Sequence, residues 1–407
     1  MKKIIFLFVT MQAFIFCFSQ NVGIGTTTPL GKLHIKSQTT QSQLVLDAAE
    51  AQGNFPRLIF RDNSGTEQLH LRANKDGLFL GLYAGQSNSP FLSGYHNLGI
   101  GYSALQYNQD GFNNTALGGH SALQSNISGS YNTAVGTNAL RYANAGDNTA
   151  VGESALLTNV SGNENTAIGR LALYSNYSGH YNTAVGFESS YSNSGSGYYN
   201  VALGHRALYN NTVGTRNIAI GAGTGTSGGT YGNTISIGNH NYLQAASNQA
   251  FLGNLNTLWN GGNVGWTTFS DGRIKKDIRE DVKGLSFILR LRPVTYNRST
   301  KAALDITGNK DDALYYEGKY DIENIRFTGF IAQEVATAAQ EVGYDFQGVQ
   351  IPTNTKQLYS LSYEAFTVPL VKAVQEQQVE IEALKAKNDE LNARLEKLEK
   401  YLKNPGL

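Results

Sequence analysis

A short motif, Asn-Thr-Ala-Val-Gly and its variants, recurs nine times in the middle of the chain, at steps of 16 to 18 residues. Such a regular period indicates that every copy forms the same structural unit. A single unit of this size buries too little apolar surface to fold alone, so the copies have to stack. We therefore expect a mainly β protein with a parallel β-roll or β-solenoid over residues 91–245. The copies begin at Asn97, Asn114, Asn132, Asn148, Asn165, Asn182, Asn200, Asn217 and Asn233.

The residues of one copy suggest how a coil is built. Thr-Ala-Val alternates, so Thr and Val share one face of a strand and Ala takes the other, where its small side chain would allow chains to approach closely. Gly ends the strand because a tight corner needs permissive backbone angles, and Asn tolerates the left-handed conformation at the other corner. In most copies an Ala-Leu pair follows the Gly: Ala104-Leu105, Ala122-Leu123, Ala139-Leu140, Ala155-Leu156, Ala172-Leu173 and Ala207-Leu208.

The distribution of charge changes sharply near residue 261. Residues 91–260 carry nine Asp, Glu, Lys or Arg, whereas residues 261–407 carry 41. The net charge of +1 gives no electrostatic reason to expect nucleic acid as a partner. Short apolar runs before the repeats predict strands. We expect six segments: a signal peptide (1–20), a small β-rich unit (21–90), the repeats (91–245), a junction (246–268), a small α+β domain (269–366) and a coiled coil (367–403).

The N-terminus has the order of a secretion signal. Lys2 and Lys3 precede an apolar stretch over residues 4–18, and polar residues follow. We therefore expect a cleaved signal peptide and a protein that is secreted or held at the cell surface without a transmembrane anchor. Cys17 is the only cysteine, so the mature chain would lack disulfides and thiolate metal sites. The seven His residues lack metal-ligand spacing, and we expect neither a metal nor a cofactor.

Heptads mark residues 367–403 as a coiled coil, because charged residues flank two apolar core positions that repeat every seven residues. Asn388 lies at a core position, where a buried polar side chain fixes register at some cost in stability. One core position holds Val374, Ile381, Asn388, Leu395 and Leu402; the other holds Leu370, Gln377, Leu384, Leu391 and Leu398.

Four motifs follow one another in the last third of the chain. They are Ser-Asp-Gly-Arg-Ile-Lys-Lys-Asp-Ile over 270–278, Leu-Arg-Pro-Val-Thr-Tyr over 291–296, Gly-Phe-Ile-Ala-Gln-Glu-Val over 329–335, and the run from Tyr359 into the coiled coil. Together they resemble the intramolecular chaperone auto-processing domain at the C-terminus of phage endosialidases and tail spikes. The repeats resemble the heads of trimeric autotransporter adhesins. Both resemblances imply a homotrimer.

The chaperone resemblance implies a catalytic dyad of Ser270 and Lys275 that cleaves the chain between Phe269 and Ser270. A serine hydroxyl is a poor nucleophile until a base takes its proton. Lysine can be that base only where burial or nearby positive charge lowers its pKa. Asp271 and Arg273 are expected to support the site, and Arg273 and Lys276 are the neighbouring cations. The site would act once, on its own chain, as a single-turnover serine peptidase.

We therefore expect an exported fibrous surface protein whose C-terminal domain is an intramolecular chaperone, trimerises the chain and cleaves itself. The alternative is an uncleaved trimeric adhesin that binds host, matrix or glycan ligands through its repeats. Ser-Asp-Gly is also ordinary turn chemistry, and tyrosines such as Tyr131, Tyr181, Tyr198 and Tyr199 at repeat edges could stack on sugars. A glycan-cleaving enzyme is disfavoured, because the repeats offer no plausible pair of carboxylates.

Overall fold

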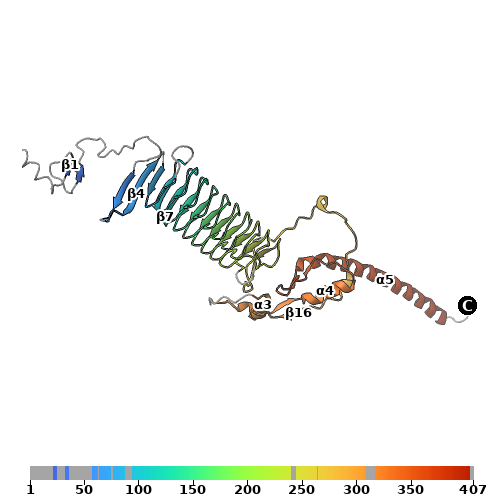
Figure 1. Ribbon diagram of the computed structural model, residues 1–407. Helices are drawn as coiled ribbons and strands as arrows, with labels where there is room; N and C mark the ends of the chain where they lie inside the picture. The colour runs from blue at the N-terminus through green and yellow to red at the C-terminus, as the bar shows by residue number, and fades with distance from the viewer. Residues whose placement is uncertain are drawn as a thin grey trace, which may run out of the picture.

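The computed structural model describes residues 22–24, 33–35, 57–62, 64–74, 77–87, 94–239, 244–263, 265–308 and 317–403. An elongated β-solenoid is followed by a small α+β region and a long C-terminal helix (Figure 1). The expected signal peptide lies outside the described residues. Strands β1 (Val22–Ile24) and β2 (Leu33–Ile35) pair in parallel with each other in a separate sheet. The predicted fold class, a solenoid followed by α+β structure, is confirmed.

A single sheet of thirteen strands runs along the solenoid, in sequence order from β3 to β15. Its first members, β3 (Arg57–Arg61), β4 (Glu67–Asn74) and β5 (Gly77–Leu80), are antiparallel neighbours. From β5 onward every neighbouring pair is parallel, so each later strand belongs to one coil. These strands are β6 (Leu98–Tyr102), β7 (Thr115–His120), β8 (Thr133–Val135), β9 (Thr149–Val151), β10 (Thr166–Ile168), β11 (Thr183–Val185), β12 (Val201–Leu203), β13 (Ile218–Ile220), β14 (Ile235–Ile237) and β15 (Ala250–Leu252).

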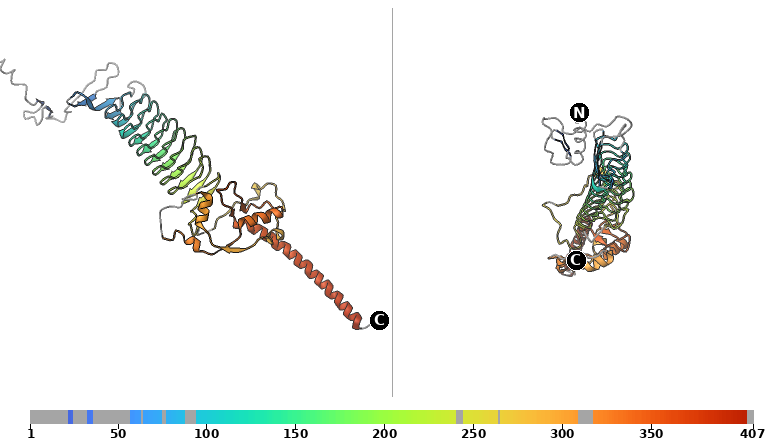
Figure 2. Two further views of the ribbon diagram at one scale, coloured as in Figure 1. Left: turned by 60° about the horizontal axis from the view of Figure 1, so that its bottom comes forward. Right: turned by 60° about the vertical axis from the view of Figure 1, so that its left-hand side comes forward.

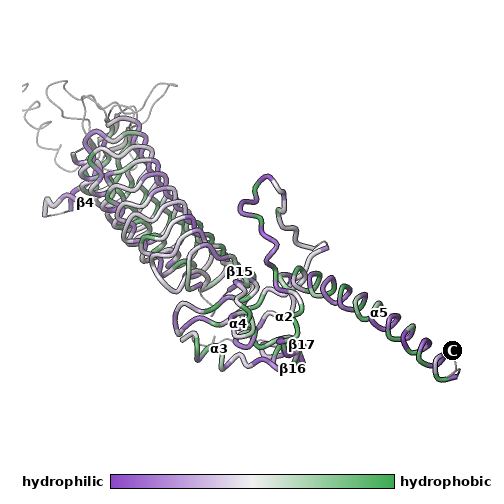
Figure 3. Tube along the Cα trace, turned by 90° about the vertical axis from the view of Figure 1, so that its right-hand side faces the viewer, coloured by the Kyte–Doolittle hydropathy of each residue, from purple (hydrophilic) through white to green (hydrophobic). Residues whose placement is uncertain are grey.

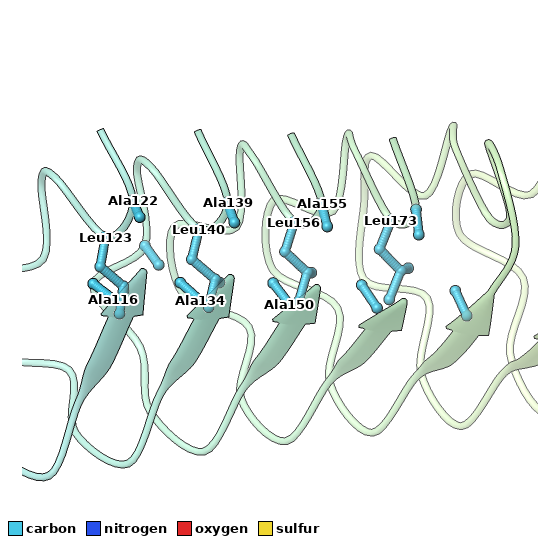
Figure 4. Packing of buried hydrophobic residues seen from close by; sticks show 14 of the residues in the cluster. Ala116, Ala122, Leu123, Ala134, Ala139, Leu140, Ala150, Ala155, Leu156 and Leu173 are labelled. Carbon is cyan, nitrogen blue, oxygen red and sulfur yellow. The ribbon is translucent and has the colours of Figure 1, made fainter. Parts of the chain in front are cut away.

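The core of the solenoid consists mainly of alanine and leucine. The central Ala of each Thr-Ala-Val strand, such as Ala150, is fully buried, and the Ala-Leu pairs pack onto it from the opposite side of the coil (Figure 4). Thr149 and Val151 flank that alanine on the outward face, as the alternation predicted. The Ala face therefore lies inside its own coil. The expectation that this face allows close approach between chains is wrong, because the Ala-Leu pairs of the same chain already cover it.

The corners of the coils confirm one expectation and correct another. Gly136 and Gly152 have φ angles of 132° and 135°, and a Cβ on Gly136 would lie 2.6 Å from the carbonyl oxygen of Gly152 in the next coil. Both the backbone angle and this close approach require glycine. The left-handed residue at the other corner precedes the motif Asn: Tyr131, for example, has φ 60°. Asn132 itself is buried, because its side chain is needed inside the coil.

The motif asparagines form a ladder of hydrogen bonds between coils. The backbone N–H of Asn182 donates to Asn165 Oδ1 at 3.0 Å, and Asn165 Nδ2 donates to the Gly179 carbonyl at 2.8 Å. The ladder satisfies polar backbone groups that the coil buries. The ladder also shows that the predicted start of the ninth copy, Asn233, is wrong. Ile218 pairs with Ile235, so Thr234 takes the ladder position and donates from its backbone N–H to Asn217 Oδ1 at 3.1 Å.

A second column of buried asparagines follows the Ala-Leu pairs, and it has one gap. Asn126 Nδ2 donates to Asn108 Oδ1 of the preceding coil at 2.6 Å. The next coil carries Ala143 at this position, and the buried Asn126 Oδ1 has no hydrogen-bond partner among the described residues. The second column resumes two coils later, where Asn176 Nδ2 donates to Asn159 Oδ1 at 2.7 Å. The gap leaves one unsatisfied acceptor inside the solenoid.

The small α+β region lies between the end of the solenoid and the long C-terminal helix (Figure 2). It is built around an aromatic core. Phe287 is fully buried, and its ring centroid lies 5.0 Å from that of Phe346 and 6.4 Å from that of Phe366. The region contacts the last coils, where Gln357 Nε2 donates to the Ala245 carbonyl at 3.1 Å. Its elements are η1 (Gly272–Ile274), α2 (Leu285–Ile288), β16 (Val294–Tyr296), α3 (Thr300–Thr307), η2 (Asp321–Asn324), β17 (Phe327–Gly329), α4 (Ala332–Glu341), β18 (Val349–Gln350), β19 (Ser360–Leu361) and η3 (Tyr363–Phe366).

Helix α5 (Thr367–Lys403) is anchored only near its N-terminal end. Pro369 and Ala373 are buried, and the backbone N–H of Leu285 donates to Glu376 Oε2 at 2.8 Å, which joins α2 to α5. Beyond this anchor the helix extends away from the rest of the chain (Figure 2). Asn388 is exposed along this free stretch. The coiled coil remains a prediction, because it requires a second helix.

Candidate functional site

Ser270 and Lys275 lie on the segment between the last coil and α2, which we call the connecting arm (residues 254–283). The arm loops away from both the solenoid and the α+β region (Figure 3). Each residue from 265 to 281 is exposed. Phe269, just before the expected cleavage point, is 95% exposed, and Trp266 is 87% exposed. The candidate bond is therefore accessible on a segment that the chain's own fold leaves uncovered.

A tight turn brings the two candidate catalytic side chains together. Asp271 Oδ1 accepts a hydrogen bond from the Arg273 backbone N–H at 2.8 Å and so caps η1. The Lys275 backbone N–H donates to the Gly272 carbonyl at 3.2 Å, which closes the turn. Lys275 Nζ then lies 2.9 Å from Ser270 Oγ. This is the distance that proton transfer from the hydroxyl to a neutral amine requires.

Arg273 contacts Asp271 rather than Lys275. Its Nε donates to Asp271 Oδ2 at 3.0 Å. Hydrogen bonding from the Arg273 side chain, followed by that from its backbone, lowers the pKa of the Asp271 carboxyl. The carboxylate therefore offsets the positive charge that the sequence suggested would act on Lys275, and the pair holds the turn in shape.

With an activated base, the contact between Ser270 and Lys275 would suit one reaction on its own chain. Ser270 Oγ would attack the carbonyl carbon of Phe269, its proton would pass to Lys275 Nζ, and the amide nitrogen of Ser270 would leave as a protonated amine. The product is an ester between Phe269 and Ser270 Oγ, which water hydrolyses to free both fragments. Nucleophile and target share one residue, so proximity is built into the backbone.

The single chain does not exclude water from Lys275, which activation of this lysine as a base requires. A lysine acts as a general base only where water is excluded or other positive charge is close. Exposure of the whole stretch from 265 to 281 leaves Ser270 and Lys275 in contact with solvent. The geometry supplies contact between the two groups, and desolvation has to come from something that covers the connecting arm.

Side-chain contacts tie the other three family-like motifs to one another. Arg292 Nε donates to Glu334 Oε2 at 3.1 Å, which joins the second motif to the third. The backbone N–H of Phe330 donates to Tyr363 Oη at 3.1 Å, which joins the third to the fourth. A Cβ on Gly329 would lie 2.1 Å from that Tyr363 oxygen. Sequence reasoning found the motifs but missed these contacts; a glycine in a strand, which often marks a close approach, was the available signal.

The tyrosines at the repeat edges stack on one another. The rings of Tyr181 and Tyr199 lie 4.9 Å apart with an interplanar angle of 5°, and Tyr191 is stacked 5.0 Å from Tyr174 and 5.2 Å from Tyr209. Stacking on a sugar needs a free ring face. Tyr191 lies between two rings, whereas the Tyr181–Tyr199 contact covers one face of each ring and leaves these residues 46% and 52% exposed.

Comparison with known proteins identifies the C-terminal part. Residues 270–344 match a protein-family model described as chaperone of endosialidase, and the match begins at Ser270 itself. This match supports an intramolecular chaperone domain in the C-terminal part of the chain that includes residues 270–344. A search of curated proteins and a search of solved structures each return no significant match.

The described residues contain neither a metal-binding cluster nor a membrane-spanning helix. There, no group of three or more His, Cys, Asp or Glu side chains is placed to hold a metal ion. In the same part of the chain, no helix combines the length and apolar character that crossing a membrane requires.

Proposed function

We propose that this is an exported fibrous surface protein whose C-terminal domain assembles three copies of the chain and then cleaves itself between Phe269 and Ser270. The observation that carries the proposal is the 2.9 Å contact between Lys275 Nζ and Ser270 Oγ, at the first residue of the chaperone-family match. The alternative, an uncleaved trimeric adhesin, shares the assembly and differs in the fate of that one bond.

Helix α5 supports assembly. Its heptad positions are exposed along the free part of the helix, including Leu384, Leu391 and Leu395 at 66%, 52% and 58%. An apolar seam of this length in water requires partner helices, and heptads supply the knobs-into-holes geometry for parallel ones. The chaperone family independently suggests self-association.

The solenoid explains why a chaperone would be useful. Each coil of this parallel sheet pairs with residues about one repeat away, for example Asn182 with Asn165, and until the next coil has formed its edge stays open to mispairing. Three chains joined at one end by α5 would begin folding in the same register. After folding, the assembly device is no longer needed, and cleavage would make the result irreversible.

Assembly would also complete the peptidase site. The connecting arm presents Trp259, Trp266 and Phe269 to solvent, and three exposed aromatic side chains on one loop favour burial against another surface. A neighbouring copy that covers the connecting arm would exclude water from Ser270 and Lys275 and so allow the lysine to act as a base. The released fragment would span residues 270–407.

The test is intact-mass measurement and denaturing gels on residues 21–407 produced with and without changes at the site. The parent should yield a fragment that begins at Ser270, and Ser270→Ala and Lys275→Ala should stay intact. Lys301→Ala is the matched control: it removes an exposed lysine on α3, outside the connecting arm, and should still cleave. A parent that stays intact while trimeric would contradict self-cleavage and establish the uncleaved alternative.

A further inference from the structure

One aliphatic residue from every strand of the long sheet falls in a single outward-facing column, which we call the aliphatic stripe. Val151 pairs with Ile168, Ile168 with Val185, and Val185 with Leu203, and the same register continues in both directions. Members of the stripe are partly or largely exposed; Leu203 and Leu252 are both 45% exposed. The stripe comprises Leu58, Leu71, Leu80, Ile100, Leu117, Val135, Val151, Ile168, Val185, Leu203, Ile220, Ile237 and Leu252.

The stripe extends beyond the sequence repeats. Leu58 on β3 pairs with Leu71 on β4, and Leu71 pairs with Leu80 on β5, although these strands are antiparallel and lack the Asn-Thr-Ala-Val-Gly motif. Duplication of a repeat unit cannot explain an aliphatic residue at these positions. The common requirement is an apolar outer surface on this column, whatever the local strand direction.

From β5 to β15, the rest of this outward face is also free of charge, because no strand there contains Asp, Glu, Lys or Arg. The charged side chains of the coils lie elsewhere, for example Glu153 and Arg170, which bond each other at 3.1 Å after their strands end. Parallel sheets are normally covered on both faces. Here the inner face is covered by the Ala-Leu pairs, whereas the described residues leave the aliphatic stripe on the outer face partly or largely exposed.

We propose that the aliphatic stripe is the surface through which copies of this chain pack against one another, side by side and in parallel. The proposal rests on the proposed function, because α5 determines the occupant. Heptad packing of α5 from each copy would bring the same end of each solenoid together, so that residues of the same number face one another. An aliphatic side chain at each level then meets its own equivalent, with no charge to desolvate from β5 to β15.

A consequence distinguishes this surface from the chaperone domain. If the solenoids hold one another through the aliphatic stripe, the fragment before Ser270 stays trimeric after the fragment from 270 to 407 has been released. The chaperone domain would then be required to form the trimer and dispensable for keeping it.

Cysteine cross-linking tests the surface directly. Residues 21–407 contain no cysteine, so Val151→Cys would introduce the only thiol, and Ser161→Cys in the same coil but outside the strand serves as control. Mild oxidation or a short bismaleimide should link two of the three chains in each trimer through position 151, and few or none through position 161. Light scattering on the same samples reports the oligomeric state.

The outcomes separate the two proposals. A trimer in which position 151 cross-links no better than position 161 would overturn the stripe as the contact surface and leave assembly by the C-terminal domain intact. A monomer would overturn the proposed assembly itself.

A second variant covers the consequence for the cleaved protein. Val151→Lys with Val185→Lys keeps both coils intact, because these side chains point outward, and should turn the fragment before Ser270 from trimer to monomer after cleavage. Ser161→Lys should leave it trimeric. Persistence of the trimer in the double variant would overturn the proposal, as would a parent fragment that is monomeric from the start.

Discussion

The interior of the solenoid and the connecting arm differ in how many of their side chains find partners within one chain. In the solenoid, the central alanines, the Ala-Leu pairs and most asparagines find their partners in the next coil of the same chain. In the connecting arm, every residue from 265 to 281 is exposed, including the candidate catalytic pair. Structure that a single chain completes can be read from its sequence repeat. A region that requires a partner instead shows exposed apolar side chains, as in the connecting arm, next to an ordered contact such as that between Ser270 and Lys275.

Removing core volume should affect the two regions very differently. Leu156 is fully buried, and Leu156→Ala should lower the free energy of unfolding by about 2–5 kcal/mol through lost burial and a residual cavity. Ile274→Ala in the connecting arm removes a side chain that is 66% exposed and should leave the unfolding of the uncleaved Ser270→Ala protein nearly unchanged. Denaturant titration followed by circular dichroism would measure both. Equal losses would contradict the distinction between the two regions.

The asparagine ladder should contribute measurably to the stability of the solenoid. Asn165→Ala leaves the buried backbone N–H of Asn182 without its acceptor, at a cost of about 1–3 kcal/mol. The Gly179 carbonyl keeps its hydrogen bond from Asn176 Nδ2. Asn210→Ala, at an exposed position, is the matched control and should change stability little. Thermal unfolding of the two variants measures this contribution. Similar melting temperatures would show that the ladder does not contribute to the stability of the solenoid.

A contact between chaperone-domain motifs gives a test with its own rescue. Gly329→Ala places a methyl group 2.1 Å from Tyr363 Oη and should destabilise the domain by about 1–3 kcal/mol through overpacking. Tyr363→Phe removes the clashing oxygen, so the double variant should recover part of the loss. Stability of the three variants and the fraction cleaved are the measurements. A double variant no better than Gly329→Ala would show that the close contact is not the cause.

Filling the gap in the second asparagine column should slightly raise the free energy of unfolding of the solenoid. Ala143→Asn would place a donor next to the unsatisfied Asn126 Oδ1, and the column already accommodates asparagine in the coils before and after. We expect an increase of about 1 kcal/mol in the free energy of unfolding. Thermal unfolding against Ala143→Ser as control would measure it, and a loss of stability would show that this shorter coil lacks room for the side chain.

Much of the fold followed from the sequence because its information is local. The spacing of the Asn-Thr-Ala-Val-Gly copies predicted stacked coils, and alternation placed Thr and Val together on one face. The direction of the Ala face was wrong, since periodicity separates two faces without saying which one is inside. The ninth copy was predicted to begin at Asn233. In the structure Thr234, one residue later, holds the ladder position, and its hydroxyl donates to Asn217 Oδ1.

The candidate site was less accessible to sequence reasoning. Resemblance to a family drew attention to Ser270 and Lys275, whose contact the turn at Asp271 explains. The pairing of Arg273 with Asp271 depends on rotamers and could not be read from spacing. The aliphatic stripe was missed beyond the repeats, because β3 and β4 run antiparallel and only strand pairing shows that Leu58 and Leu71 continue the column.

The most direct test of the account is the mass of the uncleaved protein in solution. Residues 21–407 carrying Ser270→Ala should scatter light as three chains, and Leu384→Lys with Leu391→Lys should reduce this to one chain by charging the seam of α5. A Ser270→Ala protein that is monomeric and fully folded at micromolar concentration would contradict the central claim that the C-terminal domain assembles this chain into a trimer.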